Sequence, residues 1–239
     1  MHMKRFLIPL LFLVLMAPLQ AQNLGKVLDN YFRANQTARI AEEKSMYVQA
    51  TMEQGGMSIP MKVYYKRPDK IRVEFEFQGR KALSVVNGEK GWNYMPWMSP
   101  DPQPLPGPQI EQLKEQYNME GDLWNYKEKG NKVRLDGKEK VDGRTAYKVV
   151  LDKKSGTRIV FFIDADTYLV SRMESFTSKE GKEYHTITRM ENYKDFNGFM
   201  QPTLLSTTIE GVPGKLIVRM EELRIGEEMP DSLFRKPGN

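Results

Sequence analysis

The stretch Met57–Phe77 reads MSIPMKVYYKRPDKIRVEFEF and contains two runs in which apolar and polar side chains alternate. The second run, Lys70–Phe77, is the more regular, because a charged residue separates each apolar side chain from the next. A period of two is typical of a β-strand that buries one face. Arg67 and Pro68 end the first run, so the stretch predicts two consecutive strands.

The same alternation extends in both directions from this stretch. Upstream, Gly55-Gly56 connects it to an alternating run at residues 46–52, and downstream Asn87-Gly88 lies between two short runs, which is a strong hairpin signal. From residue 132 to residue 225 the alternation resumes, with turn-forming pairs between the runs. The pattern predicts an antiparallel meander of about ten strands.

Two other stretches predict helices. Apolar residues recur with helical spacing from Leu24 to Phe32, with Asn23 as the expected N-cap, and again over Ile110–Tyr117. The stretch Pro96–Pro108 holds six prolines, which the interior of a sheet does not tolerate.

The fold class follows from these elements. So many strands with one apolar face must curl to bury that face, and the helices are available to cover its open side. We therefore expect a mainly β fold with helices. Its core is a strongly curved antiparallel half-barrel, an incomplete β-barrel, covered by an N-terminal helix and a helical lid.

The N-terminus has the order of a cleavable secretory signal. Lys4 and Arg5 precede the apolar run Phe6–Ala17, and Ala21 offers a small residue for cleavage. Removal of residues 1–21 leaves one expected domain, residues 22–239, and lowers the net charge from +5 to +3 because Lys4 and Arg5 are lost. No cysteine is present for lipid attachment, and so mild a positive charge does not indicate nucleic-acid binding. The expected location is the periplasm.

Residues suited to catalysis are sparse. His185 is the one histidine after the signal, and it lies in an alternating run, where a surface or half-buried strand position explains it. Asp164 and Asp166 form an Asp-x-Asp pair that could bind a divalent ion, but a turn between strands explains the pair equally well. Glu74 and Glu76 fit the solvated face of a strand. We expect no enzyme activity, no metal and no cofactor.

Apolar binding is better supported by the composition. The chain holds 15 Met, 11 Phe, 11 Tyr and 3 Trp residues, and methionine suits surfaces that accept varied apolar ligands. Core packing explains most of these side chains, but a curled sheet of this length encloses more volume than its own side chains usually fill. The expected lipid-binding cavity is lined by Met61, Val63, Ile71, Val73, Phe75, Trp92 and Tyr94.

Several segments resemble one known family in order and spacing. Tyr65–Arg72 resembles the K-R-P strand end of the periplasmic outer-membrane lipoprotein carriers, the LolA-like lipoprotein-sorting proteins. Val85–Pro96 is similar to that family's hairpin V-S-D-G-x-x-x-W-x-Y-x-P, and the tail Asp231–Gly238 is similar to its ending. Phe162–Asp164, followed by Leu169–Arg172, fits its later strands.

The resemblance implies a function and partners. It implies a half-barrel that carries acyl chains of a lipoprotein, or another lipid, towards the outer membrane. It also implies a monomer that meets an inner-membrane ABC-type release complex and an outer-membrane acceptor. Arg67 would fasten the lid to the sheet, which we expect it to do through the free carbonyls of the Ile110–Tyr117 helix. A lipid-sensing or lipoprotein-sensing envelope-stress regulator of the same fold is the alternative.

Overall fold

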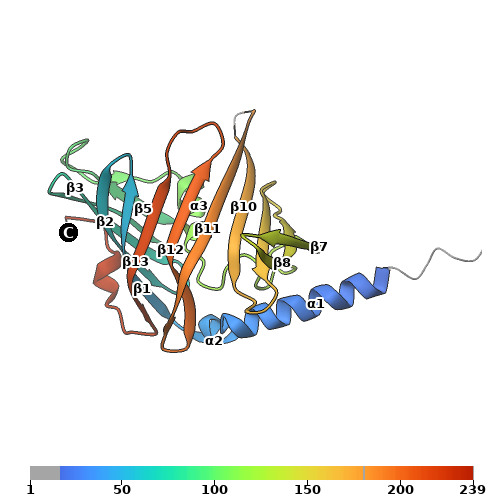
Figure 1. The fold of residues 1–239 in the computed structure, drawn as a ribbon. Helices are drawn as coiled ribbons and strands as arrows, with labels where there is room; N and C mark the ends of the chain where they lie inside the picture. The colour runs from blue at the N-terminus through green and yellow to red at the C-terminus, as the bar shows by residue number, and fades with distance from the viewer. Residues whose placement is uncertain (1–16, 180, 239) are drawn as a thin grey trace, which may run out of the picture.

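The computed structural model describes residues 17–179 and 181–238, and its main element is one antiparallel sheet (Figure 1). The sheet has 13 strands in the order β6-β5-β4-β3-β2-β1-β13-β12-β11-β10-β9-β8-β7. The strands are β1 (Ser45–Gln54), β2 (Met57–Lys66), β3 (Lys70–Phe77), β4 (Arg80–Asn87), β5 (Lys90–Tyr94), β6 (Gln103–Pro104), β7 (Lys132–Val141), β8 (Arg144–Asp152), β9 (Arg158–Asp164), β10 (Val170–Lys179), β11 (Lys182–Phe196), β12 (Phe199–Ile209) and β13 (Leu216–Ile225).

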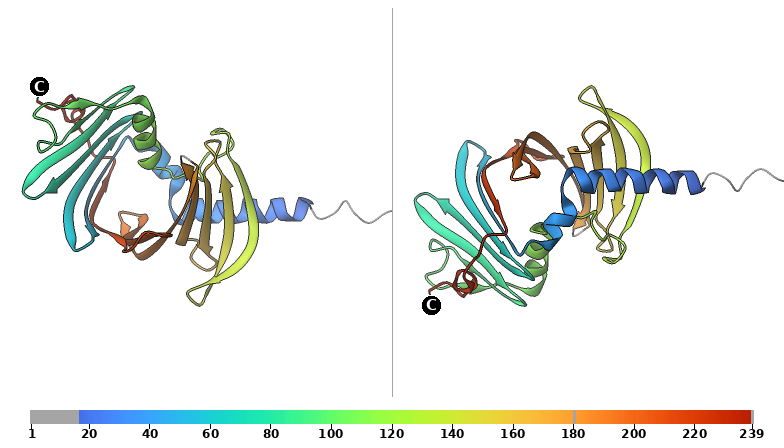
Figure 2. Two further views of the ribbon diagram at one scale, coloured as in Figure 1. Left: turned by 90° about the horizontal axis from the view of Figure 1, so that it is seen from above. Right: turned by 90° about the horizontal axis from the view of Figure 1, so that it is seen from below.

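The sheet is strongly curved and open. Its two edge strands, β6 and β7, are not paired with each other, so the barrel is incomplete. Seen from above, α2 and α3 lie on the open side of the curved sheet (Figure 2). The predicted half-barrel is therefore confirmed.

Strand register assigns each side chain to one of two faces. One row of paired residues crosses five strands from Met220 through Ala50, Met61 and Phe75 to Ala82, and we call the face that carries it the inner face. A neighbouring row begins at Tyr47 on β1, and it lies on the opposite, outer face. Since alternation with a period of two separates the rows, the sequence pattern fixes which residues share a face.

Helices α1 and α3 cover the two ends of the inner face, whereas the 3-10 helix η1 packs on the outer face. The helices are α1 (Ala17–Ala34), α2 (Thr37–Glu42), α3 (Gly107–Gln116) and the 3-10 helix η1 (Asp231–Phe234). Val27 and Leu28 of α1 pack against Val149 and Phe161 on β8 and β9. At the other end, Ile110 of α3 packs against residues of β2, β3 and β4.

Three details differ from the expectation. Asn23 lies inside α1 and does not cap it, because the helix already begins at Ala17. The short helix α2 was not predicted. The proline-rich stretch contributes the two-residue strand β6 to the sheet, which is possible because β6 is an edge strand and Pro104 needs no backbone donor on its open side.

Most of the predicted signal lies outside the described residues, which begin at residue 17, and Ala21 falls within α1. Among the helices of the described part of the chain, none has the length and apolar character needed to cross a membrane.

Candidate lipid-binding site

The middle of the inner face carries apolar side chains that remain half exposed. It borders the cluster covered by α1, against which Met173 and Met190 pack, and the cluster covered by α3, against which Met46 packs. Many of these side chains are methionines, and they come from β1, β2, β10, β11 and β13. Register and exposure place the following on this surface: Met46, Met52, Met61, Met173, Met190 and Met220. We call this surface the methionine face. Half-exposed, flexible apolar side chains can rearrange around an apolar ligand.

Five of the predicted cavity residues lie on the inner face. Met61, Val73 and Phe75 are half exposed there, whereas Val63 is 4% exposed. Ile71 is 1% exposed, because it packs in the cluster that α3 covers. The half-exposed residues can therefore contact a ligand directly, and Ile71 supports the lid.

Trp92 and Tyr94 do not belong to this group, and their predicted place in the cavity is wrong. Trp92 pairs with Val85, which is on the outer face, and Tyr94 pairs with Leu83 on the same face. Trp92 packs there against the cluster that holds Phe234 of η1. The physical reason is the register of the β4–β5 hairpin, which places Gly91 on the inner face in the position where Trp92 was expected.

Trp97 takes a position on the inner face that the sequence did not reveal. Its ring centroid lies 6.3 Å from that of Phe75 and 5.7 Å from that of Phe77, both on β3. Trp97 is 36% exposed, so a large aromatic surface stands beside the methionine face. No periodic pattern could indicate this contact, because Trp97 lies in the proline-rich stretch.

The segment 105–131 crosses the open side of the half-barrel. It follows β6 and precedes β7, which are the two edge strands of the sheet, so it must connect one edge to the other. It contains α3, whose Ile110 and Leu113 pack on the inner face. We call this segment the lid.

Arg67, at the rim, joins the sheet to the helices. Its Nε donates a hydrogen bond to the carbonyl oxygen of Glu43 at 2.7 Å, and an Nη donates to that of Ile40 at 3.4 Å. The same guanidinium forms an ion pair with Glu120 of the lid, with 2.7 Å between Nη2 and Oε1. A guanidinium suits this task because it offers several donors in a fixed plane.

The acceptor helix differs from the prediction. The carbonyls that Arg67 caps belong to the C-terminal end of α2 and not to the Ile110–Tyr117 helix. The reason is the sheet register, since the backbone amide of Arg67 donates to Lys44 just after α2 and thereby holds the side chain beside that helix. Contact with the lid comes from Glu120, beyond α3.

Lys153 joins the opposite half of the sheet to the lid. It follows β8, and its ammonium lies 3.0 Å from Glu115 and 3.2 Å from Asp122 of the lid. The Lys153 side chain is only 13% exposed. Burial alone would lower the pKa of Lys153, but the two carboxylates outweigh it and raise that pKa, so the cation is stabilised. Charged contacts thus tie the lid to both halves of the half-barrel.

A hollow of about 740 Å³ lies along these contacts. Its lining includes Tyr65 of β2 and Arg67, which directly follows that strand. Residues of the lid and of the β8–β9 turn form the rest of the lining. Tyr65 is also an inner-face residue, paired with Met46 and Ile71. The hollow therefore adjoins the inner face at the rim.

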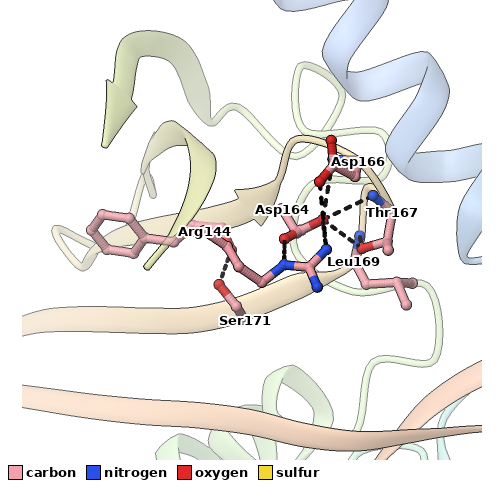
Figure 3. A network of polar contacts seen from close by, with 7 residues as sticks. Arg144, Asp164, Asp166, Thr167, Leu169 and Ser171 are labelled. Carbon is pink, nitrogen blue, oxygen red and sulfur yellow. Dashed lines mark hydrogen bonds and ion pairs between the residues drawn. The ribbon is translucent and has the colours of Figure 1, made fainter. Parts of the chain in front are cut away.

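Asp164 and Asp166 form a turn between strands. The Asp164 carboxylate accepts hydrogen bonds from Arg144 at 2.6 and 3.1 Å, and from the backbone amides of Asp166 and Thr167 (Figure 3). Burial alone would raise the pKa of Asp164, but the hydrogen bonds from Arg144 and Thr167 lower it to about 2. Its oxygens are thus engaged in structural bonds. In the part of the chain that the structure describes, no three carboxylate or histidine side chains are grouped as a metal site requires.

His185 occupies the strand position that its alternating pattern predicted. It lies on the outer face, where its ring stacks on Phe176 with centroids 4.3 Å apart. Its two ring nitrogens lie 3.3 Å from Glu174 and 3.2 Å from Glu210. Among the described residues, the hydrogen bonds of the His185 ring join it to these two carboxylates.

Several solved structures share the fold. A LolA superfamily protein from Nitrosomonas europaea superposes with a TM-score of 0.60 at 17% identity, over 88% of this chain and 97% of that chain. A DUF1329 family protein from Desulfovibrio piger has a TM-score of 0.60 at 19% identity, over 87% and 97%. A domain described as an outer membrane lipoprotein-sorting protein, from Vibrio parahaemolyticus, has a TM-score of 0.58 at 13% identity, over 87% and 97%.

The chain therefore has the fold of the LolA-like proteins, as the sequence resemblance predicted. A search of curated proteins finds no match to the sequence. A family model described as "Uncharacterized protein" matches residues 75–237, which is more than half of the chain, and the chain belongs to that family.

Proposed function

We propose that the protein is a non-enzymatic periplasmic carrier, which shields the acyl chains of a lipoprotein or of another lipid on the methionine face beneath the lid. The observation that supports this most is the half-exposed apolar surface itself, on the concave side of an open half-barrel whose two edges the lid connects. A soluble domain normally buries such a surface or uses it for binding.

The energetics explain the need for such a surface. Each exposed CH₂ group costs about 0.8 kcal/mol in water, so a chain of about 16 carbons costs roughly 13 kcal/mol. A carrier must offset most of that cost and still release the chain. A wide face with a movable cover suits this better than a tight pocket, because cargo can leave without unfolding the sheet.

The roles of individual residues follow from their places. Met61, Val73 and Phe75 would contact the chains, and Trp97 would cover their end. Arg67 would hold the lid closed until cargo enters. In this proposal the mature domain is residues 22–239, and its partners are an inner-membrane ABC-type release complex and an outer-membrane acceptor.

A binding experiment with one matched pair of variants tests the proposal. Protein expressed from the full sequence should bind an uncharged fluorescent lipid saturably, below the concentration at which the lipid forms micelles. Phe75→Glu should weaken this binding at least about tenfold, because it removes one large apolar contact and introduces a charge.

Phe176→Glu is the control, since Phe176 is 38% exposed but lies on the outer face of the same sheet. Its binding should equal that of the unmodified protein. A lack of saturable binding by the unmodified protein, or equal weakening in both variants, would contradict the carrier.

A further inference from the structure

The hollow at the rim has an excess of positive charge. Its lining includes five cationic side chains: Arg67, Lys114, Lys129, Lys153 and Lys154. It includes three carboxylates: Glu115, Glu120 and Asp122. The charged lining is therefore positive by two, and the question is which cations remain available to a ligand.

The carboxylates of the hollow are already paired. Glu120 pairs with Arg67, while Glu115 and Asp122 both pair with Lys153. Lys114 pairs with Glu111, one turn back along α3 and outside the lining.

Two cations are left over. In the part of the chain that the structure describes, no ion pair joins Lys129 or Lys154 to a carboxylate. Among the described residues, the Lys129 ammonium donates one hydrogen bond, to the carbonyl of Gly121 at 3.3 Å, and both lysines are exposed. They come from separate segments, the end of the lid and the β8–β9 turn, which are neighbours because the backbone amide of Lys154 donates to Asn131. Two available ammonium groups beside a hollow favour an anion with several oxygens.

The position of the hollow connects this charge to the apolar surface. Tyr65 lines the hollow and also lies on the inner face in register with Met46. Both belong to the cluster beneath α3, where Met46 remains half exposed and forms the near edge of the methionine face. Amides and a hydroxyl complete the lining near the lysines, from Asn118, Asn125 and Ser155. A molecule with a charged end and apolar chains could thus place each part against matching side chains.

We propose that the rim hollow binds the anionic head group of the cargo lipid, a phosphate or a carboxylate, through Lys129 and Lys154. This proposal rests on the proposed carrier function. The cargo is accordingly an anionic amphiphile, whose head group is held at the rim while its chains lie on the methionine face. The lysines select the head group, and the methionines accept chains of varied length.

The test compares two lipids that differ only in the head group. Protein expressed from the full sequence is titrated with phosphatidic acid and with diacylglycerol of the same chains. The phosphate lipid should bind at least about tenfold more tightly, as expected for charge-assisted hydrogen bonds. Lys129→Gln/Lys154→Gln should remove this preference and leave the affinity for diacylglycerol unchanged.

Lys62→Gln/Lys81→Gln is the matched control, because it removes the same charge from exposed lysines of β2 and β4, outside the hollow. It should keep the preference. The single variant Lys154→Gln, in an exposed turn, should lower the preference even if the double variant fails to fold. Circular dichroism establishes folding in each case.

The outcomes separate the two proposals. Equal binding of both lipids would overturn the head-group site and leave the carrier standing, whereas binding of neither lipid would overturn both. A third titration uses inorganic phosphate. Stabilisation by phosphate without any preference for phosphatidic acid would show that the hollow binds the free ion, and this would also overturn the head-group assignment.

Discussion

Arg67 Nη2 lies 2.7 Å from Glu120 Oε1, and this ion pair connects the end of β2 to the lid. The two side chains are 28% and 15% exposed, so solvent screens the pair only in part. The same guanidinium caps carbonyls of α2. One side chain therefore joins β2, α2 and the lid, and the lid can open only if its ion pair with Glu120 breaks.

The first prediction concerns lipid release. Arg67→Leu should raise retention of a bound lipid and slow its release to an acceptor by about tenfold, because the closed, empty state loses charged hydrogen bonds worth about 1.5–3 kcal/mol. Transfer of a fluorescent lipid to acceptor vesicles measures the rate. Glu120→Gln should produce a smaller effect in the same direction, since the amide oxygen can still accept a hydrogen bond from Arg67.

Lys62→Leu is the control for this prediction, because Lys62 is exposed and lies on the outer face of the same strand. Release at the unmodified rate from both Arg67→Leu and Lys62→Leu would show that Arg67 does not control the lid.

The second prediction concerns the turn around Asp164. Since the pKa of this carboxyl is lowered to about 2 from its ordinary value of 3.8, ionised Asp164 stabilises the folded state above pH 4, and this stability is lost as the pH falls towards 2. Asp164→Asn should lower the free energy of unfolding by about 1 kcal/mol at pH 7, a modest value because Arg144 is 60% exposed.

Urea unfolding at a series of pH values measures this effect. The difference between Asp164→Asn and the unmodified protein should shrink between pH 4 and pH 2. Asp166→Asn serves as the control, because that side chain is 86% exposed. A difference that is constant with pH would show that the Asp164 charge does not contribute.

The third prediction concerns the close contact between the lid and β5. A Cβ atom at Gly91 would lie 2.9 Å from Leu105 Cδ1, 3.1 Å from Ile110 Cγ1 and 3.1 Å from the carbonyl oxygen of Val85. Gly91→Ala should therefore push the lid away from the sheet and destabilise the protein by about 1–3 kcal/mol.

Gly107→Ala is its matched control, since a Cβ atom there meets nothing within 4 Å. Thermal unfolding measures stability, and the fluorescence of an uncharged apolar probe measures exposure of the inner face. Equal stability of the two variants would contradict the close contact between the lid and β5.

The fourth prediction concerns export. Protein made from the full sequence in a bacterial host should be found in the periplasmic fraction with Gln22 as its first residue, because Lys4–Ala21 has the features of a cleavable signal. N-terminal sequencing and fractionation measure both points. Recovery from the cytoplasm with Met1 in place would contradict the prediction.

The sequence alone determined the sheet and its two faces. Alternation along Lys70–Phe77 and its neighbours set the strands, and a period of two necessarily placed Ile71, Val73 and Phe75 on one face of β3. The helical spacing over Ile110–Tyr117 likewise indicated α3. These features are local, because they depend on residues within one or two turns or strands of each other.

Only the tertiary structure decided what each face meets. The register of the β4–β5 hairpin assigned Trp92 to the outer face, and the path of a proline-rich stretch brought Trp97 over Phe75. Contacts of Arg67 with α2 and Glu120, and of Lys153 with the lid, join residues far apart in the chain. Such contacts depend on how the whole sheet curves and where its connections cross, which no local pattern encodes.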